Sequence, residues 1–110
     1  MTDFLQVTTT TAERADAEKI AKALVERRLA ACVQILGPIA STYRWKRVVE
    51  NAVEWLCLIK TEKRLLPELE QAIKEVHPYE TPEILATAIE AGSRDYFAWL
   101  SDTLRQGALD

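Results

Sequence analysis

The segment ACVQILGPIASTYRWKRVVENAVEWLCLIKT, residues 31 to 61, decides the fold because two long apolar runs flank a short basic turn. Its first half predicts a strand that Gly37-Pro38 interrupts with a bend or bulge, since proline has no amide for the hydrogen-bond ladder. Its second half, residues 48 to 61, predicts a long partner strand after a turn at Lys46 and Arg47. The two halves together indicate an extended β-hairpin.

On the N-terminal side of this hairpin the sequence predicts a strand and then a helix. Residues 3 to 10, DFLQVTTT, alternate loosely and are rich in β-branched types, which favours a strand. Thr10 and Glu13 have the spacing of a capping box, and apolar residues then recur with a helical period as far as Leu29. We therefore expect an amphipathic helix of about five turns.

On the C-terminal side the sequence predicts a helix, a strand and a second helix. The stretch from Leu65 to Val76 has a helical period and carries Pro67 in its first turn, where proline is tolerated. HPYETPEI, residues 77 to 84, then leads into a fourth strand that ends near Ile89. A last helix is expected over residues 93 to 107, with its first serine as the cap and a glycine at its end.

This order of elements predicts one α+β domain over residues 1 to 110. It has the ferredoxin-like order βαββαβ plus a C-terminal helix, with a four-stranded antiparallel sheet. Two helices would cover one face of the sheet, and the other face would normally be polar. The segments EWLCLIK (54 to 60) and ILATAIE (84 to 90), however, are apolar on both faces. Because only one helix is left over, we expect another subunit to cover part of the sheet in a homo-oligomer.

The composition excludes several classes of protein. With 110 residues and a net charge of -3, the chain lacks the basic surface with which proteins bind nucleic acid. No apolar run approaches the roughly 18 residues that span a bilayer, and the N-terminus shows no secretory signal. We therefore expect a cytoplasmic protein without membrane contact. Cys32 and Cys57 have no CxxC spacing, which predicts two buried thiols rather than a disulfide framework.

Five segments have the order and spacing of one protein family: LAACVQI (29 to 35), STYRW (41 to 45), EWLCLIKT (54 to 61), HPYETPEI (77 to 84) and DYFAWL (95 to 100). Through them the chain resembles the CutA divalent-cation-tolerance family over nearly its whole length. The resemblance implies a ferredoxin-like protomer in a tight homotrimer, whose long β-hairpins pack between subunits. It also implies a role in the tolerance of metal ions, copper in particular.

The resemblance further implies a metal site that includes Cys32 and His77. Thiolate and imidazole ligands suit copper or zinc, whereas a site of carboxylates alone would suit magnesium or calcium. Both residues also have a structural interpretation. His77 would end the second helix and hydrogen-bond a carbonyl, and Cys32 would pack as a small apolar residue. The sequence leaves open whether the two residues meet within one chain or across two.

Two positions depart from the family pattern. Thr9 stands at the end of the first strand, where some relatives have a further cysteine, and this removes a thiolate from any soft-metal site. Arg47 stands in the hairpin turn, where relatives typically have glycine. Because arginine does not take positive φ without strain, we expect a different turn at the hairpin tip.

The segment HPYETPEI also predicts a possible cleft. Its two prolines stiffen the loop that enters the fourth strand, so Tyr79, Glu80 and Glu83 are presented at low entropic cost. Lys60, at the end of the third strand, is the expected counter-charge in this cleft. The structural alternative is a salt-bridged junction between subunits.

The sequence as a whole predicts a cytoplasmic, homotrimeric protein that binds copper or another divalent transition metal and contributes to divalent-cation tolerance. The alternative is a trimeric signalling or scaffold protein that binds a small anionic ligand in a cleft between subunits. We do not expect an enzyme, because a single histidine and the absence of a G-x-S-x-G motif leave no set of nucleophile, base and orienting group.

Overall fold

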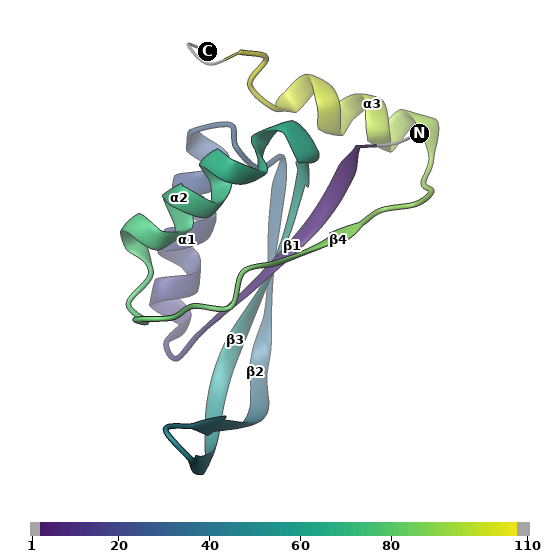
Figure 1. Cartoon of the computed structure of the whole chain (residues 1–110). Coiled ribbons are helices and arrows are strands. Elements are labelled where there is room, and N and C mark those ends of the chain that lie inside the picture. The colour runs from purple at the N-terminus through teal and green to yellow at the C-terminus, as the bar shows by residue number, and fades with distance from the viewer. Residues whose placement is uncertain (1–2, 108–110) are drawn as a thin grey trace.

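A computed structural model describes residues 3 to 107, which form one four-stranded antiparallel sheet with helices (Figure 1). In chain order the elements are β1 (Phe4–Thr11), α1 (Arg14–Glu26), β2 (Cys32–Trp45), β3 (Val48–Glu62), the 3₁₀ turn η1 (Lys63–Leu65), α2 (Leu66–Val76), β4 (Leu85–Ala88) and α3 (Arg94–Thr103). The strand order across the sheet is β2-β3-β1-β4. The predicted α+β class and the predicted order of strands and helices are confirmed.

The core lies between the sheet and two helices. α1 and α2 run side by side on one face of the sheet, and α3 lies across one end of it (Figure 1). Side chains from every layer have no exposed surface in this core, among them Val7, Ile20, Leu24, Ile59 and Ile73. Judged by length and hydropathy, none of the helices within residues 3 to 107 could span a bilayer.

Helix α1 is shorter than predicted and lacks the predicted capping box. Thr10 still belongs to β1, and the N-cap is Glu13, whose side chain makes no capping hydrogen bond. The helix then runs for 13 residues and ends where Arg28 takes a φ of 58°. Leu29 continues the apolar period because it is buried in the same core after the chain has already turned. A helical period in the sequence can therefore extend past the end of the helix itself.

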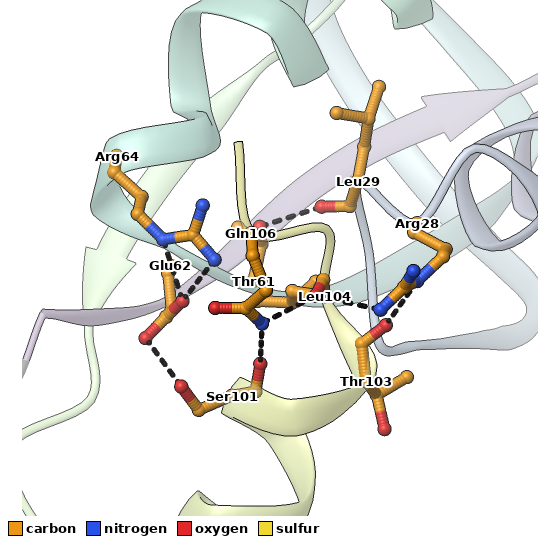
Figure 2. A network of polar contacts seen from close by, with 9 residues as sticks. All are labelled: Arg28, Leu29, Thr61, Glu62, Arg64, Ser101, Thr103, Leu104 and Gln106. Carbon is orange, nitrogen blue, oxygen red and sulfur yellow. Dashed lines mark hydrogen bonds and ion pairs between the residues drawn. The ribbon is translucent and has the colours of Figure 1, made fainter. Parts of the chain in front are cut away.

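Helix α3 also ends earlier than predicted, and Arg28 binds the carbonyl groups at its end. The helix begins as expected, with the Ser93 hydroxyl accepting a hydrogen bond from an amide of the first turn. It stops at Thr103, before the glycine at position 107. In Figure 2, Arg28 donates from Nε to the Thr103 carbonyl oxygen at 3.1 Å and from Nη2 to the Leu104 carbonyl oxygen at 3.2 Å. These bonds satisfy carbonyls that a helix end leaves without partners.

Beyond Trp55, β3 separates from β1, and β2 and β3 continue as a two-stranded ribbon. We call residues 39 to 54 the arm. At its base the pairing register shifts between Leu36 and Ile39, which is the bulge predicted at Gly37-Pro38. A Cβ atom on this glycine would lie 2.6 Å from the Trp55 ring, so a larger residue would push the ring away.

The arm ends in a two-residue turn between the paired residues Trp45 and Val48. Lys46 has a φ of 48° and Arg47 a φ of 70°, so both take the left-handed conformation of a type I′ turn. The expectation that arginine would avoid positive φ at this position was wrong. The twist of the flanking strands favours this turn type and outweighs a local cost of about 1–2 kcal/mol for each residue that is not glycine.

The second face of the sheet, opposite α1 and α2, is open in the single chain. Leu36 and Leu85 are 56% and 63% exposed on it. On the arm, Val49 and Val53 are 54% and 62% exposed. The helices of one chain therefore leave exposed part of the apolar surface for which the sequence predicts a second subunit.

Two fully buried threonines of the sheet differ in their hydrogen bonding. Thr61 Oγ1 donates to the Leu29 carbonyl oxygen at 2.7 Å (Figure 2), whereas Thr9 Oγ1 has no partner within the described part of the chain. We expect Thr9→Val to raise the free energy of unfolding by about 1 kcal/mol, because valine removes an unpaired buried hydroxyl and keeps its shape. Urea denaturation at one fixed protein concentration measures this change.

Thr61→Val is the matched control for this prediction. It leaves the Leu29 carbonyl without its donor and should lower the free energy of unfolding by about 1–3 kcal/mol. If Thr9→Val destabilised the chain as much as Thr61→Val does, the Thr9 hydroxyl would have a bonding role that the structure does not show.

Candidate functional site

A cavity of about 540 Å³ lies where the arm meets the loop of residues 77 to 84. Three glutamates and three aromatic residues line it: Glu54, Glu80, Glu83, Tyr43, Trp45 and Tyr79. The other lining residues carry hydroxyl groups: Thr10, Ser41, Thr42 and Thr81. We call this cavity the glutamate pocket. It unites the predicted cleft residues Tyr79, Glu80 and Glu83 with side chains from the arm.

His77 fixes the loop at the point where it leaves α2. The residue is extended, with φ -79° and ψ 132°, as expected before a proline, and it ends the helix. His77 is 9% exposed, and its Nε2 lies 2.9 Å from the Thr10 carbonyl oxygen. Nδ1 accepts a hydrogen bond from the Tyr79 amide at 3.1 Å. Because the carbonyl can only accept, Nε2 carries the proton and Nδ1 does not.

These contacts give His77 the structural role that the sequence offered as an alternative to metal binding. Burial lowers the pKa of His77 below its usual value of 6.5 and outweighs the opposing effects of the Thr10 hydrogen bond and of the Asp16 and Glu54 charges. The ring is therefore neutral and uses both nitrogens to join β1 to the loop. To bind a metal ion, it would have to give up one of these hydrogen bonds.

Glu54 and Tyr79 join the arm to the loop across the pocket. Glu54 lies on β3 opposite Ile39 and is 6% exposed. The Tyr79 hydroxyl donates to Glu54 Oε2 at 2.6 Å. Burial, and then Glu54 itself, raise the pKa of Tyr79 far above its usual range, so the phenol keeps its proton and remains a donor. At the rim, Glu83 Oε2 accepts a hydrogen bond from the Thr8 hydroxyl at 2.8 Å.

Lys60 and Cys32 lie outside this pocket. They face each other across β2 and β3, and Lys60 donates from Nζ to Gln34 Oε1 at 2.9 Å. Lys60 is six residues along β3 from Glu54, which is about 20 Å in an extended strand. Lys60 is therefore distant from Glu54, but it lies closer to Glu83, whose partner Thr8 is paired with Leu58, two residues from Lys60 along β3.

Cys32 and His77 are also separated within the chain. Cys32 lies level with Lys60, whereas His77 is bonded to Thr10, which is paired with Leu56. The four-residue step between those two β3 positions corresponds to about 13 Å. One chain therefore does not bring the two proposed metal ligands together.

The two cysteines differ in their surroundings. Cys57 is fully buried, and burial raises its pKa to about 11, so its thiol is an apolar packing group as predicted. Cys32 is only partly buried. It lies beside Tyr96, whose pKa is raised mainly by burial and further by the Cys32 thiol. Residues 3 to 107 contain no group of three or more His, Cys, Asp or Glu side chains that could hold a metal ion.

Sequence reasoning missed Glu54 and the aromatic residues of the arm as parts of the site. Glu54 is a single carboxylate between Val53 and Trp55, in a run that is otherwise apolar. A charged residue in such a run is rarely buried unless it has a partner. Its position in the run was therefore the sequence signal that could have marked Glu54 as a site residue. Its partner, Tyr79, is 25 residues away in sequence and could not be identified without the fold.

Comparison with known proteins finds relatives that match most of the length of this chain. The family model described as CutA1 divalent ion tolerance protein matches residues 5–103. The divalent-cation tolerance protein CutA of Thermus thermophilus is 48% identical over 86 residues, which are 78% of this chain and 84% of that protein. A solved structure of the divalent cation tolerance protein from Thermus thermophilus has a TM-score of 0.90 and 42% identity, and the match covers 93% of this chain and 99% of that one.

A mammalian relative is longer. Protein CutA of Mus musculus is 44% identical over 84 residues, which are 76% of this chain. These residues make up 48% of the mouse protein, so the chain spans about half of its length.

Proposed function

Since this chain belongs to the CutA1 divalent ion tolerance family, we propose that it binds metal ions as a homotrimer and acts in the tolerance of divalent cations, with copper as its principal metal. It is a binding protein rather than an enzyme, and we assign it to the cytoplasm. The observation that carries the proposal is the family match over residues 5–103.

The homotrimer is supported by the surface that one chain leaves open. The arm is a two-stranded ribbon, and such ribbons are marginally stable in water without further packing. Val49 and Val53 are more than half exposed on it, and Leu36 and Leu85 are exposed on the open face of the sheet. Apolar surface of this kind is typical of a contact between subunits.

The metal site that we propose is built around Cys32. Its thiol is partly exposed, whereas the Cys57 thiol is buried and has a raised pKa, which keeps it protonated. Thiolate is the ligand that copper(I) and zinc prefer. Because residues 3 to 107 of one chain hold no complete ligand set, the proposal requires ligands from more than one copy, with His77 as a candidate if it releases the Tyr79 amide.

The glutamate pocket of one chain offers no support for the alternative function, in which a small anion binds in a cleft between subunits. Three glutamates line the glutamate pocket, and none of its lining residues is a lysine, an arginine or a histidine. Lys60, the expected anion-binding cation, lies outside it. An anion in this pocket would be repelled by the carboxylates around it.

The test is an anaerobic equilibrium titration of the protein with copper(I), copper(II) and zinc. We expect saturable binding at a simple ratio of metal to chains, and a loss of affinity of roughly tenfold or more in Cys32→Ser. Cys57→Ala is the control, because it removes the buried thiol and leaves the exposed one. Binding that does not saturate, or that is the same in Cys32→Ser and in the unaltered protein, would refute the proposed site.

A further inference from the structure

The carboxylates of the glutamate pocket have no cationic partner in the pocket lining among residues 3 to 107 of one chain. Glu54, Glu80 and Glu83 line the cavity, and no cationic side chain of the described residues shares the lining with them. The ion pairs formed by residues 3 to 107 use other carboxylates, such as Glu18, Glu62 and Glu75. Glu54 is the most buried of the three, and its hydrogen-bond donor is the neutral Tyr79 hydroxyl. A buried carboxylate without a counter-charge is costly, and a bound cation would offset that cost.

The aromatic lining indicates what kind of cation fits. Tyr43, Trp45 and Tyr79 contribute rings to the cavity wall. Aromatic rings attract ammonium and guanidinium groups and also pack against the carbon atoms beside them. Trp45 already has one such contact, since Lys46 Nζ lies 5.8 Å from the centre of its ring. The same ring is therefore suited to an ammonium group.

The size of the pocket and its ligand chemistry favour an organic cation over a metal ion. A volume of about 540 Å³ is within the range of small-molecule sites and far exceeds the space that a single ion occupies. The three glutamates do not form a metal-binding group, because no such group of His, Cys, Asp or Glu exists in residues 3 to 107. An organic cation needs only one carboxylate for its charge and apolar or aromatic walls for its body.

We infer that the glutamate pocket binds a small aliphatic ammonium ion, of which an alkyl diamine is the simplest form. The carboxylate of Glu54 receives one ammonium group, Tyr43 and Trp45 cover the aliphatic part, and Glu83 at the rim receives the second ammonium group. This site goes beyond the proposed metal function, because it shares neither Cys32 nor His77.

The test uses three probes that have the same four-carbon body and differ in charge. These are 1,4-diaminobutane, 1,4-butanediol and succinate, each titrated into the full-length protein by calorimetry at moderate salt. We expect saturable binding of the diamine, and no saturable binding of the diol or of succinate at millimolar concentration. Equal binding of all three probes, or no saturable binding of the diamine, would overturn the inference.

Two glutamate variants locate the site. Glu54→Gln keeps an acceptor for the Tyr79 hydroxyl but removes the charge, so diamine affinity should fall by roughly tenfold or more. Glu50→Gln removes an exposed carboxylate from the same strand, outside the pocket lining, and should leave the affinity unchanged. If both variants bind the diamine as tightly as the unaltered protein does, the site is elsewhere and the inference fails.

The same variants separate this inference from the proposed function. Cys32→Ser should leave diamine binding intact, and Glu54→Gln should leave copper binding intact. Failure of the metal titration alone would therefore refute the proposed metal site, and failure of the diamine titration alone would refute the organic-cation site.

Discussion

Replacement of both Val49 and Val53 by glutamate is expected to convert the proposed homotrimer into single chains at micromolar concentration. The two residues are four positions apart on β3, so their side chains point to the same side of the arm. Both are more than half exposed in one chain, so the charges are tolerated there. In an interface, each buried valine contributes about 1.5 kcal/mol or more, and an unpaired buried carboxylate costs still more.

Light scattering measures the mass, and thermal unfolding at several protein concentrations measures how stability depends on assembly. The unaltered protein should show the mass of three chains and a midpoint that rises with concentration, and the double variant should show neither. The control, Lys22→Gln with Gln71→Glu, changes the net charge by the same amount at exposed helix positions. A single-chain mass for the unaltered protein would refute the assembly, and a trimeric mass for the double variant would remove the arm from the interface.

His77→Ala is expected to lower the free energy of unfolding by about 2–5 kcal/mol. The change removes two hydrogen bonds and leaves the Thr10 carbonyl and the Tyr79 amide without their partner, each at a cost of about 1–3 kcal/mol when buried. His77→Gln is the control, because its amide group can still donate to the Thr10 carbonyl and should recover part of the loss. Denaturant unfolding at one protein concentration measures both values. A loss below about 0.5 kcal/mol would show that these bonds do not hold the loop.

The same residue makes stability depend on pH. Burial lowers the pKa of His77 in the folded chain below 6.5, so the unfolded chain binds the proton more readily. The contribution of neutral His77 to the free energy of unfolding is therefore complete above pH 6.5. It is lost as the pH falls through the lower pKa of the folded state. Comparison of the free energy of unfolding at mildly alkaline and mildly acidic pH should show a fall for the unaltered protein and a smaller fall for His77→Gln. Equal falls in the two proteins would assign the pH dependence to other groups.

The order of strands and helices could be predicted because local signals agree with the fold. β-branched residues mark β1, the apolar runs mark the arm, and Pro67 marks the first turn of α2. The ends of the helices could not be predicted as well. The apolar period passes the end of α1 because Leu29 is buried beyond it, and the end of α3 depends on Arg28, which is distant in sequence.

Only the residues that the loop contributes to the site could be predicted from the sequence. HPYETPEI has the rigidity and the polar groups that mark a functional segment, and Tyr79, Glu80 and Glu83 do line the pocket. Lys60, which was expected to supply a counter-charge there because it ends the third strand, does not line the pocket in one chain. In the fold, β3 runs from the arm tip into the sheet, so Glu54 meets Tyr79 of the loop, whereas Lys60 lies six residues further along the strand and bonds Gln34.

The contacts of Arg28 with the end of α3 determine how the C-terminal part of the chain can open. A ten-residue helix has little stability of its own in water, so α3 depends on its attachment. One of its anchors is Arg28, which belongs to the connection between α1 and β2 in the first third of the sequence. The amide protons of α3 should therefore exchange with solvent at about the same rate as those at the end of α1. Fraying of the C-terminal segment alone would make them exchange faster. The end of α1 and helix α3 thus belong to one cooperative unit.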